Sequence, residues 1–187
     1  MSSDPTLSPE QRRELEDARD RARKILVAGK VAAFNGWTIG IFAALSFLFG
    51  LGSPVVMVLA LALGAVAWNE FRGRTLLRRL DPSAGLLLGR NQLGLMALIV
   101  AYCLWSIWRA KAGPPDPEME QLQDLVGVGS DLIEQLTVIL YVSVIAATAI
   151  FQGLNARYYF RRVGMTEAYL SETPPWVVDL QRSAALD

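Results

Sequence analysis

The feature that most constrains this chain is an uncharged block from Val31 to Asn69, in which no Lys, Arg, Asp or Glu occurs. A membrane-spanning helix needs about 20 mostly apolar residues. The block is therefore too long for one span and has the length of two. Gly50 to Pro54 divides it, because two glycines and a proline give the turn chemistry that ends one helix and begins the next. A tight helical hairpin is predicted there.

Two further uncharged blocks, Asn91 to Trp108 and Gln135 to Ala156, each have the length of one span. So many apolar segments in a chain of 187 residues would leave almost no polar shell around a soluble core. The sequence therefore predicts an all-α, polytopic membrane protein with short flanking amphipathic helices. The transmembrane domain covers residues 31–156, and its four spans are expected at about 31–50, 54–70, 91–109 and 132–156.

The distribution of positive charge predicts the orientation of these spans. All but two of the 18 Lys and Arg residues fall in the N-terminal segment, the connection after the second span and the C-terminal tail, which are residues 1–30, 71–90 and 157–187. Cytoplasmic loops retain Lys and Arg during insertion, so both termini are expected in the cytoplasm and the acidic loop 110–131 outside. Short loops and this charge asymmetry are typical of the bacterial inner membrane.

Three segments outside the spans are expected to be helical. Ser8, Pro9 and Gln11 form a capping-box pattern that predicts a helix from residue 9, continuing into the first span unless Gly29 interrupts it. Its apolar stripe is narrow and mostly alanine, and it belongs either to a docking helix or to a solvated extension. Asp116 predicts the start of a short acidic helix in the external loop, and Pro175 the start of a final helix in the tail.

Aromatic residues are expected to form two belts, because Trp and Tyr prefer the level of the lipid headgroups. The inner belt would contain Trp37, Trp68, Tyr158 and Tyr159, and the outer belt Trp105 and Trp108.

The chain lacks the residues of most catalytic and metal sites. It has no histidine and a single cysteine, Cys103, which excludes imidazole ligands, thiolate clusters and triads of the Ser-His-Asp kind. It also has no glycine-rich phosphate loop and no dinucleotide fingerprint. We therefore expect no enzymatic activity, no cofactor, no metal and no nucleic-acid partner.

The polar residues within the spans all fall toward the cytoplasmic side in the predicted topology. They are Asn35, Asn69, Glu70, Asn91, Gln92, Gln152 and Asn155. At that depth such groups are costly unless they bond across helices or face water. Two interpretations follow: a hydrogen-bond belt that locks the bundle, or a polar vestibule open to the cytoplasm for a small ligand or ion. No ionisable residue falls near the midplane of the bilayer, which argues against an ion-coupled transporter within one chain.

Small residues are candidates for close helix packing, and a group of arginines is a candidate for contact with lipid. Close helix packing is predicted at the glycines of small-residue repeats, which are Gly36, Gly40, Gly64 and Gly153. These faces are used within the chain or between protomers. Three arginines stand beside three leucines after the second span, and they are either suited to contact lipid phosphates or serve only to orient the protein. The arginines are Arg74, Arg78 and Arg79, and the leucines are Leu76, Leu77 and Leu80.

Two functional hypotheses remain. The first is a non-enzymatic accessory or scaffold subunit whose helices bind lipids, copies of itself or another membrane protein. The second is a small oligomeric channel or transporter that uses the inner polar residues and the acidic outer loop. A lipid-modifying enzyme at the inner interface is disfavoured because the usual catalytic residues are missing.

Overall fold

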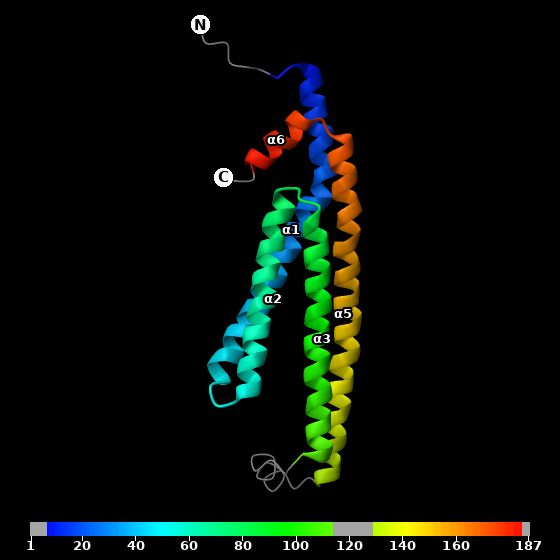
Figure 1. Ribbon diagram of the computed structural model, residues 1–187. Helices are drawn as coiled ribbons and strands as arrows, with labels where there is room; N and C mark the ends of the chain where they lie inside the picture. Colours follow the sequence, from blue (N-terminus) through cyan, green and yellow to red (C-terminus); the bar gives the residue numbers. More distant parts are fainter. Residues whose placement is uncertain (1–6, 114–128, 185–187) are drawn as a thin grey trace. The chain divides into compact units, whose positions relative to one another are not determined.

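The computed structural model describes residues 7–113 and 129–184, and this part of the chain is entirely helical outside short turns. Its helices are α1 (Pro9–Phe49), α2 (Pro54–Arg78), α3 (Ser83–Ala112), α5 (Ser130–Glu172) and α6 (Pro175–Ala184), shown in Figure 1. The first four are long and apolar enough to cross a membrane. The all-α class is confirmed, and the acidic helix expected from Asp116 lies outside the described residues.

Helix α1 begins where the capping pattern predicted it. The Ser8 side chain accepts a hydrogen bond from the Gln11 backbone N–H, and the Gln11 side chain accepts one from the Ser8 N–H, at 3.2 and 2.9 Å. This reciprocal pair satisfies two of the donors that a helix start leaves free. The helix then runs without a break through Gly29, so the N-terminal helix and the first apolar segment are one element.

The turn between α1 and α2 is the predicted hairpin. Gly50 is needed for space, because a side chain there would lie 2.5 Å from the Ser46 carbonyl oxygen and from Val56. Ser53 caps α2 by accepting from the Val56 backbone N–H, and Pro54 occupies the first turn. The two helices run antiparallel and in contact (Figure 1).

The turn between α2 and α3 is built on Leu80, whose φ of 55° lies in the left-handed region. The Leu80 N–H bonds to the Leu77 carbonyl and the Asp81 N–H to the Leu76 carbonyl, which is the Schellman pattern of a helix C-terminus. Glycine is the usual residue here, and leucine is tolerated because its side chain is fully packed. Helix α3 then begins at Ser83 and includes Gly85.

The contacts divide the chain into two compact units, each described separately: residues 1–91 with 155–187, and residues 92–154. In the first unit a buried cluster joins all five helices. Its members are Ala18, Ala22, Ile25, Ala28, Ala32, Leu77, Leu80, Ala84, Leu88, Tyr159, Tyr169, Val177 and Val178.

This cluster corrects two expectations. The alanine stripe of α1 is neither a solvated extension nor a free docking face, because it is covered by the chain's own helices. Leu77 and Leu80 are buried in the same cluster, so they are not available to lie in a membrane interface beside the arginines. Alanine at helical spacing allows this close approach of neighbouring helices.

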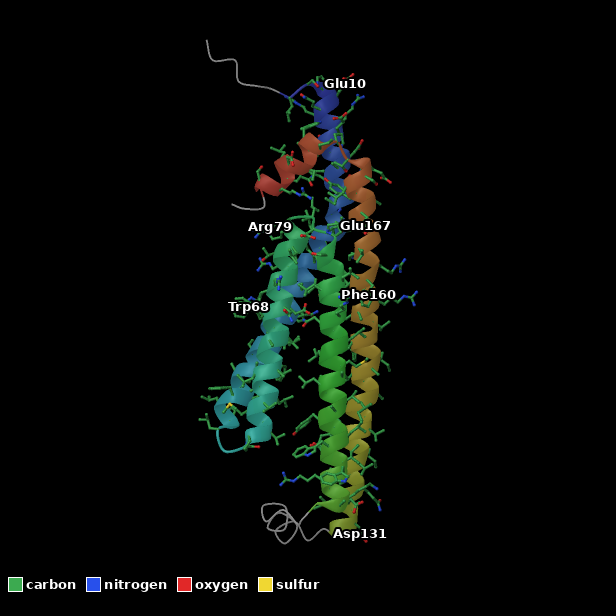
Figure 2. All side chains as sticks on the ribbon, in the orientation of Figure 1. Glu10, Trp68, Arg79, Asp131, Phe160 and Glu167 are labelled. Atoms are coloured by element: carbon green, nitrogen blue, oxygen red, sulfur yellow. The ribbon has the colours of Figure 1, made fainter. Side chains whose placement is uncertain are left out.

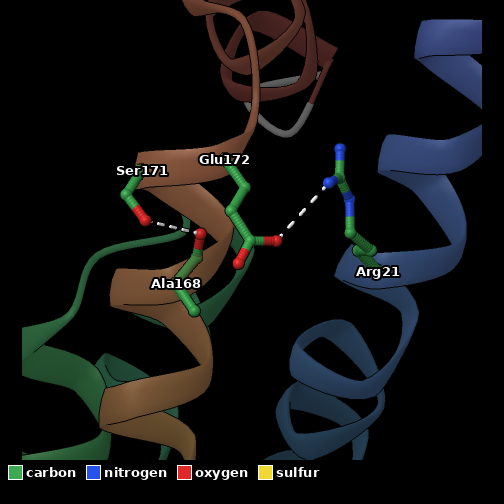
Figure 3. A network of polar contacts seen from close by, with 4 residues as sticks. All are labelled: Arg21, Ala168, Ser171 and Glu172. Atoms are coloured by element: carbon green, nitrogen blue, oxygen red, sulfur yellow. Dashed lines mark hydrogen bonds and ion pairs between the residues drawn. The ribbon is translucent and has the colours of Figure 1, made fainter.

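The final helix predicted from Pro175 is present as α6, and it packs against the same cluster. Val177 is fully buried, and the Tyr169 hydroxyl donates to Gln181 Oε1 at 2.7 Å. Arg21 of α1 and Glu172 at the end of α5 form an exposed ion pair of 3.5 Å close to this helix (Figure 3). Burial of apolar side chains, rather than this exposed pair, holds α6 in place.

The second unit contains the later part of α3 and the earlier part of α5. Tyr102 and Tyr141 meet edge to face with ring centroids 6.3 Å apart, and Lys111 pairs with Glu134 at 3.7 Å. Cys103 is buried.

Apolar side chains on the long helices are largely exposed. In the most apolar 18-residue window of α5 none of the residues is buried, and in α1, α2 and α3 the share is 17%, 17% and 11%. Trp68, pointing outwards from α2 in Figure 2, is 72% exposed. Water is a poor solvent for such surfaces, whereas lipid or partner helices would cover them.

Candidate functional site

Five polar side chains from four helices meet inside the first unit. They are Asn35 of α1, Asn69 and Glu70 of α2, Asn91 of α3 and Tyr159 of α5, and we call them the inner polar network. Glu70 and Tyr159 are fully buried, and Asn91 is almost so. A carboxyl group is rarely found at such a position unless other groups bond to it.

Glu70 is at the centre of the network. Its Oε1 accepts a hydrogen bond from Asn91 Nδ2 at 2.7 Å, and its Oε2 accepts one from the Tyr159 hydroxyl at 3.4 Å. Both carboxyl oxygens are therefore bonded to side chains of other helices. The phenol is a suitable donor because it keeps its proton at neutral pH.

The outer members extend these bonds to the remaining helices. Asn35 Nδ2 donates to the Tyr159 oxygen at 3.2 Å, which adds α1 to the network. Asn91 Nδ2 also donates to the Val66 carbonyl at 3.0 Å, and Asn91 Oδ1 accepts from Asn69 Nδ2 at 3.3 Å. One continuous chain of hydrogen bonds thus links α1, α2, α3 and α5.

Glycines allow the helices to come close enough for these bonds. Beside Asn35, a side chain at Gly36 would lie 3.1 Å from the Phe71 ring and 3.2 Å from Glu70 Cβ. On α3, a side chain at Gly85 would lie 2.8 Å from the Tyr159 carbonyl oxygen, and one at Gly89 would overlap the Phe160 ring. Gly73 of α2 faces Leu88 equally closely.

The four glycines predicted to pack against other helices differ in how closely they are enclosed. Gly36 is tightly enclosed and Gly40 makes an ordinary contact with Ala67, at 3.8 Å. A side chain at Gly64 or Gly153 would meet nothing within 4 Å among the described residues. For these two, contact with another protomer stays a prediction.

The other predicted polar residues are placed as follows. Gln92 is buried, and Gln152 and Asn155 are half-buried. Gln152 Oε1 is buried without a hydrogen-bond donor among the described residues. Arg74, Arg78 and Arg79 are exposed, and the Arg79 carbonyl accepts from Arg182 Nε at 3.2 Å. Their contact with lipid phosphates stays a prediction.

Sequence reasoning missed Tyr159 and the glycines of α3. Tyr159 was assigned to the inner aromatic belt, but it is fully buried and bonds to Glu70. The signal for the glycines was available, since Gly85 and Gly89 are four residues apart and form a GxxxG pattern. The sequence gives little reason to choose Tyr159 over its neighbour Tyr158, because both are tyrosines. Only the folded helix shows which of the two points into the network.

The chemistry of the site is that of neutral amides, a phenol and one carboxyl group. Among residues 7–113 and 129–184, no cluster of three His, Cys, Asp or Glu side chains could hold a metal ion. The inner polar network can join the helices through hydrogen bonds that Asn91 and Tyr159 donate to Glu70. Comparison with known proteins gives no match: no family model, no curated protein and no solved structure is significantly similar to this chain.

Proposed function

We propose that this chain is a non-enzymatic integral component of the bacterial inner membrane, an accessory or scaffold subunit that acts through helix packing and oligomerisation. The proposal includes four membrane spans, both termini in the cytoplasm, and a partner that is a second copy of the chain or another membrane protein.

One contrast supports this function. The polar groups of α1, α2, α3 and α5 bond to one another in the inner polar network, where Glu70 is 0% exposed. The apolar sides of the same helices are left exposed, including Phe42 at 60% and Ile139 at 61%. Polar groups that are satisfied internally favour a fixed helical framework, and apolar faces favour contact with lipid or other helices.

Photo-crosslinking in cells tests the proposed role. A photoreactive amino acid replaces Phe42 on α1 or Ile139 on α5, and Glu14, exposed outside the apolar segment of α1, is the control position. Irradiation is expected to give a product of defined mass at one or both span positions and none at Glu14. The mass identifies a second copy or a different membrane protein. Lipid adducts alone at both span positions would contradict an oligomerising or partner-binding role.

The second hypothesis is a small oligomeric channel or transporter with a polar vestibule open to the cytoplasm. It is favoured by Gln152 Oε1, which is buried without a donor among the described residues and would gain one from water in a wet cavity. The closed bonding of Glu70 favours the scaffold. Cation flux into liposomes that contain the purified protein distinguishes the two hypotheses. A channel gives more flux than empty liposomes, and this flux changes in the Glu70→Gln variant. A scaffold gives no flux above that of empty liposomes.

A further inference from the structure

A groove of about 390 Å³ opens on the surface of the first unit, between the N-terminal part of α1 and the C-terminal part of α5. It is lined by Asp20, Arg23, Lys24 and Val27 of α1 and by Arg162 of α5. Three cations and one carboxylate give it a net positive charge. We call it the basic groove, and it is separate from the inner polar network and from the arginines of α2.

The cations of the basic groove are not neutralised by neighbouring acids. In the described part of the chain, neither Arg23 nor Lys24 nor Arg162 has a carboxylate within 4 Å. Like charges held close together repel one another unless an anion lies between them. The groove is therefore suited to an anionic group.

Arg162 is held in a fixed position, which distinguishes the groove from a set of mobile surface cations. Its guanidinium carbon lies 4.2 Å from the centre of the Tyr158 ring, and its Nη1 contacts Met165 Sδ. Its Nε is buried and has no hydrogen-bond acceptor among the described residues. Stacking on an aromatic ring orients an arginine for binding a planar or tetrahedral anion.

The position of the groove along the helices indicates which anionic group it can reach. Arg23 to Val27 precede the first apolar segment, which starts at Val31, and at 1.5 Å per residue Val27 and Lys24 lie roughly 6 and 10 Å beyond its end. Arg162 follows Ala156 at the end of the last segment by roughly 9 Å. The headgroup layer of a bilayer extends about 5 to 8 Å beyond the hydrocarbon on each side. The groove therefore spans the outer edge of the headgroup layer in the proposed orientation, and the long side chains of Lys24 and Arg162 can reach the lipid phosphates.

We propose that the basic groove binds a phosphate group, supplied by the headgroup of an anionic phospholipid. Arg162 and Lys24 contact the phosphate oxygens from the two helices, and Arg23 adds to the positive field. Asp20 accepts a hydrogen bond from a headgroup hydroxyl, and the exposed Val27 side chain lies at the end of the groove nearest the apolar segment. Choice of a lipid source rests on the proposed membrane orientation, whereas the phosphate chemistry rests on the groove alone.

The test compares two variants of the full chain in detergent that each lose two positive charges. Lys24→Gln with Arg162→Gln removes cations of the groove. Arg157→Gln with Arg161→Gln is the matched control, because both residues are exposed on the same stretch of α5 and neither lines the groove. Phosphatidylglycerol, phosphatidylcholine of the same acyl length, and inorganic phosphate at constant ionic strength are titrated separately. Bound lipid is counted by native mass spectrometry, and the shift in melting temperature gives the half-saturating concentration.

The proposal expects the groove variant to need at least tenfold more phosphatidylglycerol for half-saturation, and the control to stay within about twofold of the parent. Phosphatidylcholine is expected to bind weakly to all three proteins. If the groove variant binds inorganic phosphate more weakly than the control does, and the two bind phosphatidylglycerol equally, the groove is a phosphate site for free phosphate and not for a lipid. Equal binding by the groove variant and the control would overturn the proposal.

Arg162 also packs on Tyr158, so the groove variant is first melted without ligand. If it unfolds well below the parent, Arg23→Gln with Lys24→Gln replaces it, since both side chains are exposed. The same ratio of half-saturating concentrations is expected. Crosslinking at Phe42 and Ile139 does not depend on this result, so failure of the lipid site and failure of the proposed scaffold role are distinguishable.

Discussion

Glu70 of α2 and Asn91 of α3 form a 2.7 Å hydrogen bond at a position where the carboxyl group is 0% exposed. The bond crosses from one helix to the next, and the second carboxyl oxygen is bonded to Tyr159 of α5. Removing Glu70 would therefore leave the buried Tyr159 phenol without this acceptor and leave the Asn91 amide with the Val66 carbonyl as an acceptor. The cost of such unpaired groups is larger than the net gain from the bonds themselves.

The first prediction concerns the stability of Glu70 variants in detergent. Glu70→Ala is expected to lower the free energy of unfolding by about 2 to 4 kcal/mol, because it adds a cavity to the loss of the hydrogen bonds from Asn91 and Tyr159. Glu70→Gln is expected to cost about 1 kcal/mol or less, since its amide oxygen still accepts from Asn91. Chemical or thermal unfolding of both variants measures the difference.

A double-mutant cycle with Asn91→Ala provides the control. The two losses are expected to be non-additive by about 0.5 to 2 kcal/mol, as for residues that share a bond. Additive losses, or a Glu70→Ala variant as stable as the parent, would show that the network does not hold the helices together.

The second prediction concerns the glycines of α3. Gly85→Ala and Gly89→Ala are each expected to destabilise the protein by about 1 to 3 kcal/mol, because the added methyl groups overlap the backbone and side chains of α5. Gly64→Ala is the matched control, since nothing lies within 4 Å of the new methyl group. It is expected to be neutral or to stabilise α2 by up to about 1 kcal/mol through helix propensity. Equal melting temperatures for all three variants would contradict this packing.

Local signals explain why the helices themselves could be predicted from the sequence. Uncharged blocks place the apolar parts of the long helices, and the Ser8 capping pattern and the Gly50 turn mark the two ends of α1. The extensions of α2, α3 and α5 beyond their blocks were not predicted, because charged residues interrupt the apolar pattern there. The turn at Leu80 could not be predicted in the same way, because leucine is an unfavourable residue for φ of 55°. Burial of its side chain compensates, and burial is a property of the folded chain.

The side chains that bond to one another between helices could be predicted only in part. The depth of Asn35, Asn69, Glu70 and Asn91 indicated that these side chains are near the same level, and the structure joins them by hydrogen bonds. Tyr159 was outside that set because a tyrosine next to the end of a span usually lies at the headgroups. The direction of a side chain around its helix depends on rotation of the whole helix, which residue type does not determine.

The third prediction tests the proposed orientation. In a background where Cys103 is replaced by alanine, Gly52→Cys in the α1–α2 turn is expected to react with an impermeant thiol reagent added to intact cells. Ser183→Cys in α6 is expected to react only after the membrane is opened. Both positions are exposed, so a difference in labelling reports which side of the membrane each position faces. Labelling of Ser183→Cys from outside would reverse the orientation.

The last prediction concerns attachment of α6. Val177 is 0% exposed within the cluster that includes Ala18, Ala22 and Tyr169, whereas Leu180 on the same helix is 45% exposed. Val177→Asp places a charge in this apolar contact, and release of α6 costs less than burying that charge. We expect residues 175–184 of this variant to exchange their amide hydrogens at least tenfold faster, with little change in the apolar segments. Leu180→Asp carries the same new charge on the exposed side and should exchange like the parent protein. Faster exchange than the parent in both variants would show that an added charge releases α6 wherever it is placed, and exchange like the parent in both would show that the Val177 contact does not hold the helix.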